Sequence, residues 1–254
     1  MTRRIVFTSG KGGVGKTTVA AGIGVQLSRL GNQVVLVDAD FGLNNVDVVT
    51  GLEKYVTFDL ADVVEGRCRA RQALVQHPRF PNFYILTGER AATKKYVSPQ
   101  SLKIVLDGVA PQFDYILVDC PAGLENGFHR AVSLAEEGVV VTTPHISALR
   151  DADKVVSALK SYRLKSVELI VNMARGDRII SGDALSPAEI AEILKIPLLA
   201  ALPEEEDAYL NTFADKRRAY AIAANNLAGG KRRYFDPTKE YLGLLGWLKR
   251  RLKG

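Results

Sequence analysis

The chain has 254 residues, 47% hydrophobic and 24% charged, which is typical of one soluble domain with a large core and excludes a disordered or fibrous protein. Residues from 231 onward hold eight basic and two acidic side chains, so the whole net charge of +6 lies there. Residues 1–230 are therefore neutral overall, which argues against a basic surface that coats DNA.

The residue types also indicate the compartment. Two cysteines, Cys68 and Cys120, are too few for a disulfide framework and lack a metal-binding spacing, so we expect a reducing cytoplasm. Residues 1–9 have the pattern of a strand and not of a signal peptide. No apolar run approaches the roughly 18 residues of a membrane-spanning helix.

Apolar, β-branched runs alternate with segments of helical period along the chain. This alternation predicts an α/β fold of the P-loop NTPase kind, with a largely parallel sheet covered by helices on both faces. The ligand is expected at the carboxyl ends of the strands. Strands are predicted at 5–8, 34–37, 84–86, 115–118, 139–142, 167–171 and 198–202, and helices at 17–30, 99–109, 127–135, 151–162 and 187–194.

The first strand runs into a glycine-rich turn suited to hold phosphate. Gly10, Gly15, Lys16 and Thr17 fit the P-loop pattern. In that pattern backbone N–H groups wrap the phosphates, the lysine reaches the terminal ones and the hydroxyl binds Mg²⁺. The residues expected to bind nucleotide here are Gly10, Lys11, Gly12, Gly13, Val14, Gly15, Lys16, Thr17 and Thr18.

A dinucleotide site is the rival interpretation of the same glycines. With Gly12 they also spell G-x-G-x-x-G, and Asp38 lies near the distance at which such a fold places its ribose-binding acid. The stretch 16–18, Lys-Thr-Thr, favours a triphosphate with Mg²⁺, because a dinucleotide requires neither the lysine nor the metal-binding hydroxyl. NAD therefore stays a minor alternative.

Carboxylates close two of the predicted strands. Asp38 and Asp40 follow the second strand and Asp119 follows the fourth. At such positions in a P-loop sheet they can reach the Mg²⁺ shell or the water that attacks the terminal phosphate. The alternative is that they cap the next turns of the chain, which is our interpretation of Asp47.

Lys11 is unusual because a phosphate loop needs one lysine and Lys16 supplies it. With both lysines, the sequence KGGVGKTT resembles the deviant Walker A motif of the ParA/MinD family of ATPases. Nearly the whole chain resembles the septum site-determining branch of that family. The segments that carry this resemblance are DADFGLNNVDVVTGLEK, DLADVVEGRCRARQALVQHPRFPNFYIL, ILVDCPAGLENGF, VVVTTP with SALRDADKV, and SGDALSPAEIAEILKIPLLAALPEE.

The resemblance implies catalytic roles and cofactors. Lys11 would cross an ATP-sandwiched homodimer to the partner's phosphates in place of an arginine finger, while Lys16 cradles the β- and γ-phosphates. Asp40, in the first switch with Asp38, would orient the attacking water, and Asp119 would be the Walker B acid. The implied cofactors are ATP and Mg²⁺, and the reaction is hydrolysis that depends on dimerisation. The implied metal-binding residues are Thr17, Asp38 and Asp119.

The base of the nucleotide has a predicted site as well. The family recognises adenine with an asparagine that Asn172 matches, and backbone near Pro203 would complete the pocket. Two positions depart from the family pattern: Met173 replaces a frequent arginine, and His145 replaces a frequent glutamate.

The end of the chain, 237–254, is expected to form a C-terminal amphipathic helix that targets the membrane, after an ATPase domain at 1–236. Pro237 is placed to start the helix, which would form on meeting lipid, and the basic residues suit an anionic surface. A helix packed on the protein's own core is the alternative. The residues expected at the membrane are Tyr241, Leu244, Leu245, Trp247, Leu248, Lys249, Arg250, Arg251 and Leu252.

The function implied by the resemblance is that of an ATPase that positions the cell-division site. Its dimer would lie on the inner face of the cell membrane, recruit a division inhibitor of the MinC type and respond to a MinE-type or scaffold-type regulator, without sequence-specific nucleic-acid binding. Two alternatives stay open. One is a flagellar-number ATPase of the same family, which shares GLNNVDVV but usually has an extra N-terminal segment. The other is a ParA-type DNA-partitioning ATPase.

Overall fold

The computed structural model describes residues 1–41, 45–88, 97–204, 218–229 and 232–243. Within these ranges the strands form one eight-stranded sheet in the order β3-β4-β2-β5-β1-β6-β7-β8. Strand β3 pairs antiparallel with β4 at one edge, and the other pairs are parallel. The strands are β1 (Arg3–Thr8), β2 (Val34–Asp38), β3 (Val75–His77), β4 (Phe80–Leu86), β5 (Tyr115–Asp119), β6 (Glu137–Thr142), β7 (Ser166–Ala174) and β8 (Leu198–Pro203).

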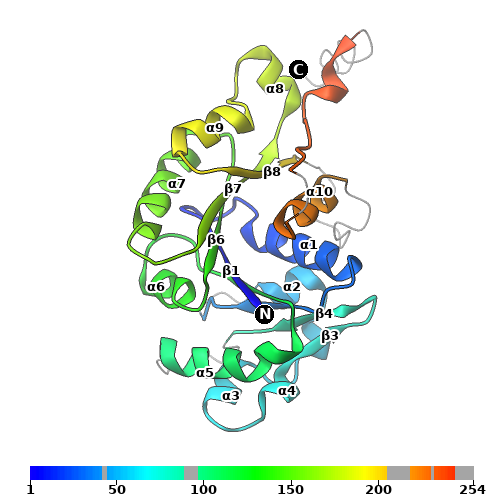
Figure 1. Cartoon of the computed structure of the whole chain (residues 1–254), viewed down its shortest axis with the longest axis vertical. Helices are drawn as coiled ribbons and strands as arrows, with labels where there is room; N and C mark the ends of the chain where they lie inside the picture. Colours follow the sequence, from blue (N-terminus) through cyan, green and yellow to red (C-terminus); the bar gives the residue numbers. More distant parts are fainter. Residues whose placement is uncertain (42–44, 89–96, 205–217, 230–231, 244–254) are drawn as a thin grey trace.

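Helices cover both faces of this sheet. Figure 1 shows α1 and α10 on one side and α6, α7 and α9 on the other. The helices are α1 (Lys16–Arg29), α2 (Val46–Thr50), α3 (Leu60–Val64), α4 (Ala70–Ala73), α5 (Pro99–Val109), α6 (Asn126–Val132), α7 (Ile146–Leu159), α8 (Gly176–Ser181), α9 (Pro187–Leu194) and α10 (Arg218–Leu227), with 3₁₀ turns η1 (Glu53–Tyr55), η2 (Ala110–Gln112) and η4 (Lys239–Tyr241).

The core is split into two apolar layers by the sheet. Ile5 and Phe7 point to the layer beneath α1 and α10, whereas Val6 between them points to the layer beneath α5, α6, α7 and α9. This alternation follows from the two-residue period of a strand. Because both faces are covered, the central strands are continuous apolar runs, which is why the sequence identifies them so clearly.

The predicted fold class is confirmed, and all seven predicted strands and all five predicted helices are present. Helix α7 begins at Ile146, five residues before the predicted start at 151, because the extended backbone of His145 marks the N-terminal end of the helix. Helix α6 ends at Val132, short of the predicted 135. The sequence missed β3 and the helices α2, α3, α4, α8 and α10.

The position of β1 determines where the site lies. It is flanked by β5 on one side and β6 on the other, so the chain order reverses around it. A ligand site is expected off the carboxyl ends of the strands at such a reversal. The loop after β1 is the glycine-rich turn, which therefore lies at the centre of the carboxyl edge.

The C-terminal segment differs at its start from the predicted helix. Residues Lys239–Tyr241 form the short turn η4, after which Leu242 is extended with ψ 154° and Gly243 is left-handed with φ 73°. A helix is therefore not continuous from Lys239 in this structure. The remaining predicted membrane residues, Leu244, Leu245, Trp247, Leu248, Lys249, Arg250, Arg251 and Leu252, lie outside the described residues, and their helix stays a prediction.

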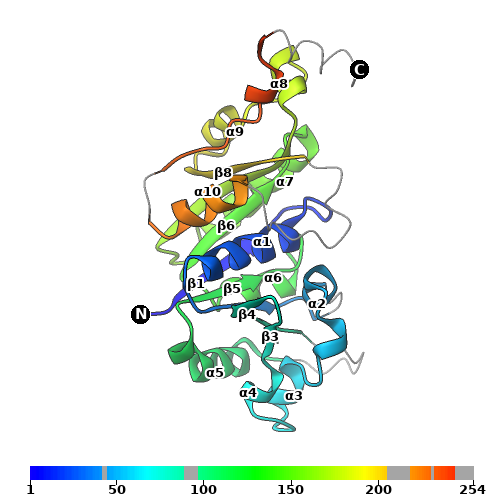
Figure 2. The same cartoon turned by 90° about the vertical axis from the view of Figure 1, so that its right-hand side faces the viewer.

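This segment is in contact with α8, beside which η4 lies in both views (Figures 1 and 2). A Cβ atom added to Gly176 would come within 1.9 Å of the Pro237 carbonyl oxygen and 2.8 Å of the Tyr241 ring. Pro237 is buried and Tyr241 is half-buried, so part of the Tyr241 side chain packs against the protein here. Among the described residues, no helix has the length and apolarity needed to cross a membrane.

Candidate functional site

The glycine-rich loop joins β1 to α1 and leaves the start of the helix open to a ligand. Gly13 and Gly15 have φ values of 81° and 79°, a region that glycine enters without strain. Gly15 is the N-cap of α1 and supplies no side-chain cap to the first turn. The first N–H groups of a helix have no partner within it and carry partial positive charge, so this end of α1 suits phosphate.

Close packing also fixes the glycines at the two ends of the loop. A Cβ on Gly10 would lie 2.2 Å from the Asp151 carbonyl oxygen of α7, and one on Gly15 would lie 2.5 Å from Nδ2 of Asn172. The same Nδ2 atom donates a hydrogen bond to the Val14 carbonyl oxygen over 2.9 Å. The phosphate loop is thus held between α7 and β7, with Asn172 as a direct support.

A buried ion pair lies beneath the loop. Lys16 Nζ is 2.6 Å from Asp119 Oδ1, and the Thr17 hydroxyl donates to Asp119 Oδ2 over 2.7 Å. The side chains of Lys16 and Asp119 are only 9% and 3% exposed. One carboxylate thereby positions both the lysine and the hydroxyl of the P-loop motif.

Asp38 lies beside this pair at the end of β2, where Asp38 and Asp119 are register partners. Its carboxylate accepts hydrogen bonds from the backbone N–H groups of Asp40, Asn45 and Val46 at 2.9, 3.1 and 3.2 Å. Burial and the neighbouring Asp119 charge nevertheless raise the pKa of Asp38 from 3.8 to about 7. Burial also raises the pKa of Asp119, against the opposing effect of Lys16.

The donor set fits Mg²⁺ bound together with phosphate. A hydroxyl from Thr17 and carboxylates from Asp38 and Asp119 are hard oxygen ligands, the kind that Mg²⁺ prefers. In the part of the chain that the structure describes, no three His, Cys, Asp or Glu side chains are grouped as a complete metal site. Mg²⁺ needs no such group, because one or two carboxylates, waters and substrate phosphates complete its shell.

The remaining residues of the predicted site lie at its rim. Lys11, Gly12 and Gly13 are exposed, and the Lys11 side chain makes no hydrogen bond or ion pair with any residue that the structure describes. Thr18 is half-buried in the first turn of α1. Asp40 is half-buried, two residues beyond the end of the β2–β5 pairing.

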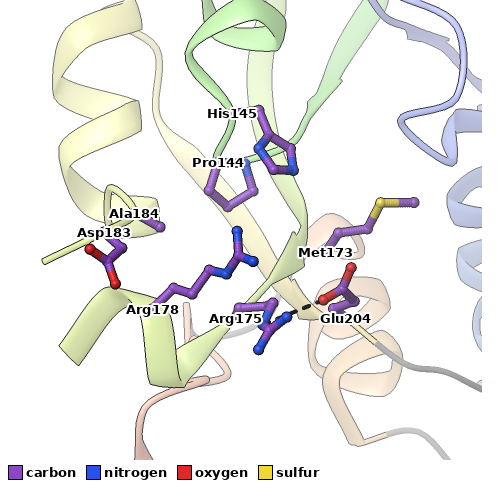
Figure 3. A pocket seen from close by; sticks show the side chains of 8 residues that line it. All are labelled: Pro144, His145, Met173, Arg175, Arg178, Asp183, Ala184 and Glu204. Carbon is purple, nitrogen blue, oxygen red and sulfur yellow. Dashed lines mark ion pairs between the residues drawn. The ribbon is translucent and has the colours of Figure 1, made fainter. Parts of the chain in front are cut away.

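A cavity of about 190 Å³ opens beyond Met173, at the carboxyl ends of β6, β7 and β8 (Figure 3). Met173 has a left-handed backbone with φ 55° at an irregularity in the β7–β8 pairing, and its Cε lies 3.6 Å from the Cβ position of Gly15. Arg175 is 3.6 Å from Glu204 and pairs with Asp177 at 2.5 Å. The cavity is lined by Pro144, His145, Met173, Arg175, Arg178, Asp183, Ala184 and Glu204.

Of the residues that line this cavity, the sequence identifies only His145 and Met173, and it does not identify Arg175 or Arg178. In Figure 3 the Arg178 side chain points from α8 toward Pro144. A signal was present, because both arginines closely follow a predicted strand at the edge where ligands bind. The two arginines do not belong to a motif of known spacing, and their position alone does not identify them as part of a site.

Comparison with known proteins gives a consistent picture. A family model described as an AAA domain matches residues 2–169. The chain is 37% identical to the septum site-determining protein MinD of Synechocystis sp. over 265 aligned residues, with 100% of both chains covered. It is similar to a solved MinC:MinD cell division protein complex of Aquifex aeolicus, with a TM-score of 0.81, 35% identity and coverage of 92% of this chain and 100% of that one.

A second solved structure is informative about ligands. It is the septum site-determining protein MinD of Pyrococcus horikoshii complexed with Mg-ADP, with a TM-score of 0.76, 34% identity and coverage of 90% of this chain and 95% of that one. These relatives do not favour the flagellar-number or DNA-partitioning alternatives.

Proposed function

The chain belongs to the MinD family of septum site-determining ATPases, and from this premise we infer that it positions the cell-division site by binding and hydrolysing ATP with Mg²⁺. The observation that carries the inference is the buried centre of Lys16, Thr17 and Asp119 under the open end of α1. A P-loop with this centre binds a nucleoside triphosphate rather than a dinucleotide.

The residues of the centre have different roles in binding the phosphates. Lys16 neutralises charge on the terminal phosphates, and the loop N–H groups and the start of α1 hold the oxygens in place. Thr17 and Asp119, with Asp38 beside them, hold Mg²⁺, which supplies further neutralisation of the phosphate charge. Asp40 orients the attacking water from the end of β2.

The active unit in this proposal is a homodimer. Lys11 supports it, because this second lysine is exposed at the rim and has no partner within the described part of the chain. A lysine so placed can reach the phosphates of a facing protomer, where it acts as an arginine finger does. Neither site is complete until the partner arrives, so ATP binding also serves as the signal for assembly.

The adenine is assigned to the ends of β7 and β8. Asn172 directly follows the regular part of the β7–β8 pairing and lies next to the loop, and Pro203 pairs with Ala174 on the neighbouring strand. Met173 offers an apolar side chain between this region and the cavity of Figure 3. The base would therefore lie against apolar and amide groups and not on an arginine.

Membrane and partner binding complete the proposal. The dimer binds an anionic membrane on its cytoplasmic side through 244–254, and two linked tails bind more tightly than one. A division inhibitor of the MinC type is the proposed partner, supported by the solved MinC:MinD complex, and a MinE-type or scaffold-type regulator controls release.

Sedimentation with anionic liposomes tests this function. The matched variant is a chain truncated after Gly243, because it keeps the Pro237–Tyr241 contact with α8 and removes only residues 244–254. Binding of the full chain should require ATP and fall with salt, and the truncated chain should dimerise with ATP but stay in solution. Equal pelleting of the two chains, or retention on DNA in place of liposomes, would contradict the proposal.

A further inference from the structure

The segment after β2 carries Asp40 and is fixed to the protein at several points. The Ala39 N–H donates to the Asp119 carbonyl oxygen over 2.9 Å, which continues the β2–β5 pairing past the strand end. The Asp40 N–H donates to the Asp38 carboxylate. Phe41 comes next, and its partly buried ring packs against the core layer beneath α5, α6, α7 and α9.

Arg130 of α6 lies against the same ring. Its guanidinium carbon is 4.3 Å from the centre of the Phe41 ring, well within the range of an attractive cation–π contact. The side chains of Phe41 and Arg130 are both partly buried, so solvent weakens the contact less than it would at an open surface. Phe41 is thus clamped between the apolar core and a cation.

Helix α6 is rigidly connected to the loop after Asp119. A Cβ on Gly127 would lie 2.6 Å from Cγ of Pro121, so the start of α6 packs directly on that loop. Phe128 is 1% exposed and meets Tyr162 edge to face, which anchors the helix from the other side. Arg130, one turn beyond Gly127, therefore holds a fixed place relative to Asp119.

We propose that Arg130 is a positioning residue for ATP hydrolysis, because it clamps Phe41 and thereby fixes the backbone of Asp40 against the loop after Asp119. The proposal rests on the role of Asp40 assigned above, the orientation of the attacking water. Arg130 does not touch the phosphate loop, Lys16 or Thr17 through any contact of the described chain, so ATP binding should not depend on it. Its loss should slow the chemical step alone.

The test uses single-turnover hydrolysis of Mg-ATP by the full-length protein, with ATP affinity and ATP-dependent dimerisation measured beside it. Arg130→Met keeps the apolar stem and removes the cation, and we expect it to slow hydrolysis about fivefold at unchanged ATP affinity. Arg130→Lys restores a cation over the ring and should recover most of the rate. Phe41→Leu should slow hydrolysis about as much as Arg130→Met does, and the double variant should be no slower than the slower single variant, because both changes break the same Arg130–Phe41 contact.

Asp40→Ala separates the clamp from the role of Asp40. If Asp40→Ala abolishes hydrolysis while Arg130→Met hydrolyses at the wild-type rate, the clamp is wrong and the function stands. Arg130→Lys as slow as Arg130→Met would also overturn the clamp, because the cation would then be irrelevant. Hydrolysis by Asp40→Ala at the wild-type rate would overturn the role of Asp40 and the clamp together.

Discussion

One charged pair lies at the carboxyl ends of the central strands (the carboxyl edge) and another at their amino ends (the amino edge), and the two pairs differ in kind. At the carboxyl edge Lys16 and Asp119 are joined at 2.6 Å in a nearly sealed environment. At the amino edge Arg3 of β1 binds Glu137 of β6 through two bonds of 2.8 and 2.7 Å, with the arginine side chain 33% exposed. Both pairs join a cation to a carboxylate, yet only the first lies where a ligand can bind.

The pKa shifts of the carboxylates separate the two edges. Burial raises the pKa values of Asp38 and Asp119, so the folded chain without ligand disfavours the charges that it holds there. The hydrogen bond from Arg3 lowers the pKa of Glu137, so the fold favours that charge. Groups held in an unfavourable charge state are typical of functional sites, whereas a well-paired carboxylate serves stability. The carboxyl edge is arranged for phosphate and metal, and the amino edge for the fold.

Removing the cation should weaken ATP binding at the carboxyl edge and leave it unchanged at the amino edge. Lys16→Ala should lower ATP affinity about 100-fold or more, because a charge-assisted contact to phosphate is lost and Asp119 keeps a buried charge without its partner. The matched control is Arg3→Ala, which should bind ATP as the wild type does. Isothermal titration calorimetry measures both. Similar losses in the two variants would show that Lys16 acts through folding and not through phosphate.

Asp38 should give stability a pH dependence opposite to that of a well-paired carboxylate. Its pKa is raised from 3.8 to about 7, so between these values the folded state holds a proton that the unfolded state has released. Stability without nucleotide or Mg²⁺ should therefore fall as pH rises through this window, by on the order of 5 °C in melting temperature. Asp38→Asn should remove that slope, as measured by thermal unfolding in EDTA. An unchanged slope in Asp38→Asn would assign the effect to other groups.

The amino edge should show the smallest effect, with the opposite sign. The lowered pKa of Glu137 means that its pairing adds stability above the ordinary value of 4.5, and that this stability is lost as pH falls through the folded-state pKa. Glu137→Gln should therefore cost about 1 kcal/mol at neutral pH and almost nothing at a pH below the folded-state pKa of Glu137, where the wild-type carboxyl is protonated as well. Urea unfolding at the two pH values measures the difference. A loss of equal size at both would point to packing and not to charge.

Most of the carboxyl edge could be predicted from sequence because its residues are close neighbours of strands. The P-loop motif follows β1 directly, and Asp38 and Asp119 each end a run of apolar residues long enough to be recognised as a buried strand. Parallel pairing then brings the ends of these strands together without further information. The short elements between residues 46 and 77 span five residues or fewer, which is too few to show a periodic pattern.

Other features depend on contacts that local patterns do not contain. An apolar helical face fits lipid and protein equally well, so the sequence alone does not show that the Tyr241 ring packs on Gly176. The contact of Arg130 with Phe41 joins segments that are far apart in the chain, and a single arginine in a helix gives no reason to expect it. The left-handed backbone of Met173 likewise depends on the irregular β7–β8 pairing.

Mixing two inactive variants tests most directly that the carboxyl edge is one half of a shared ATP site. Lys11→Ala lacks the lysine given to the partner, and Asp40→Ala lacks the residue that orients water in its own site, so each alone should hydrolyse ATP about 100-fold more slowly than the wild type, or slower still. A mixed dimer contains one complete site, with Lys11 from one protomer and Asp40 from the other. Equimolar mixing should restore steady-state turnover to about a quarter of the wild-type rate, since half of randomly paired dimers are mixed and each has one working site. A mixture no faster than its components would contradict the shared site.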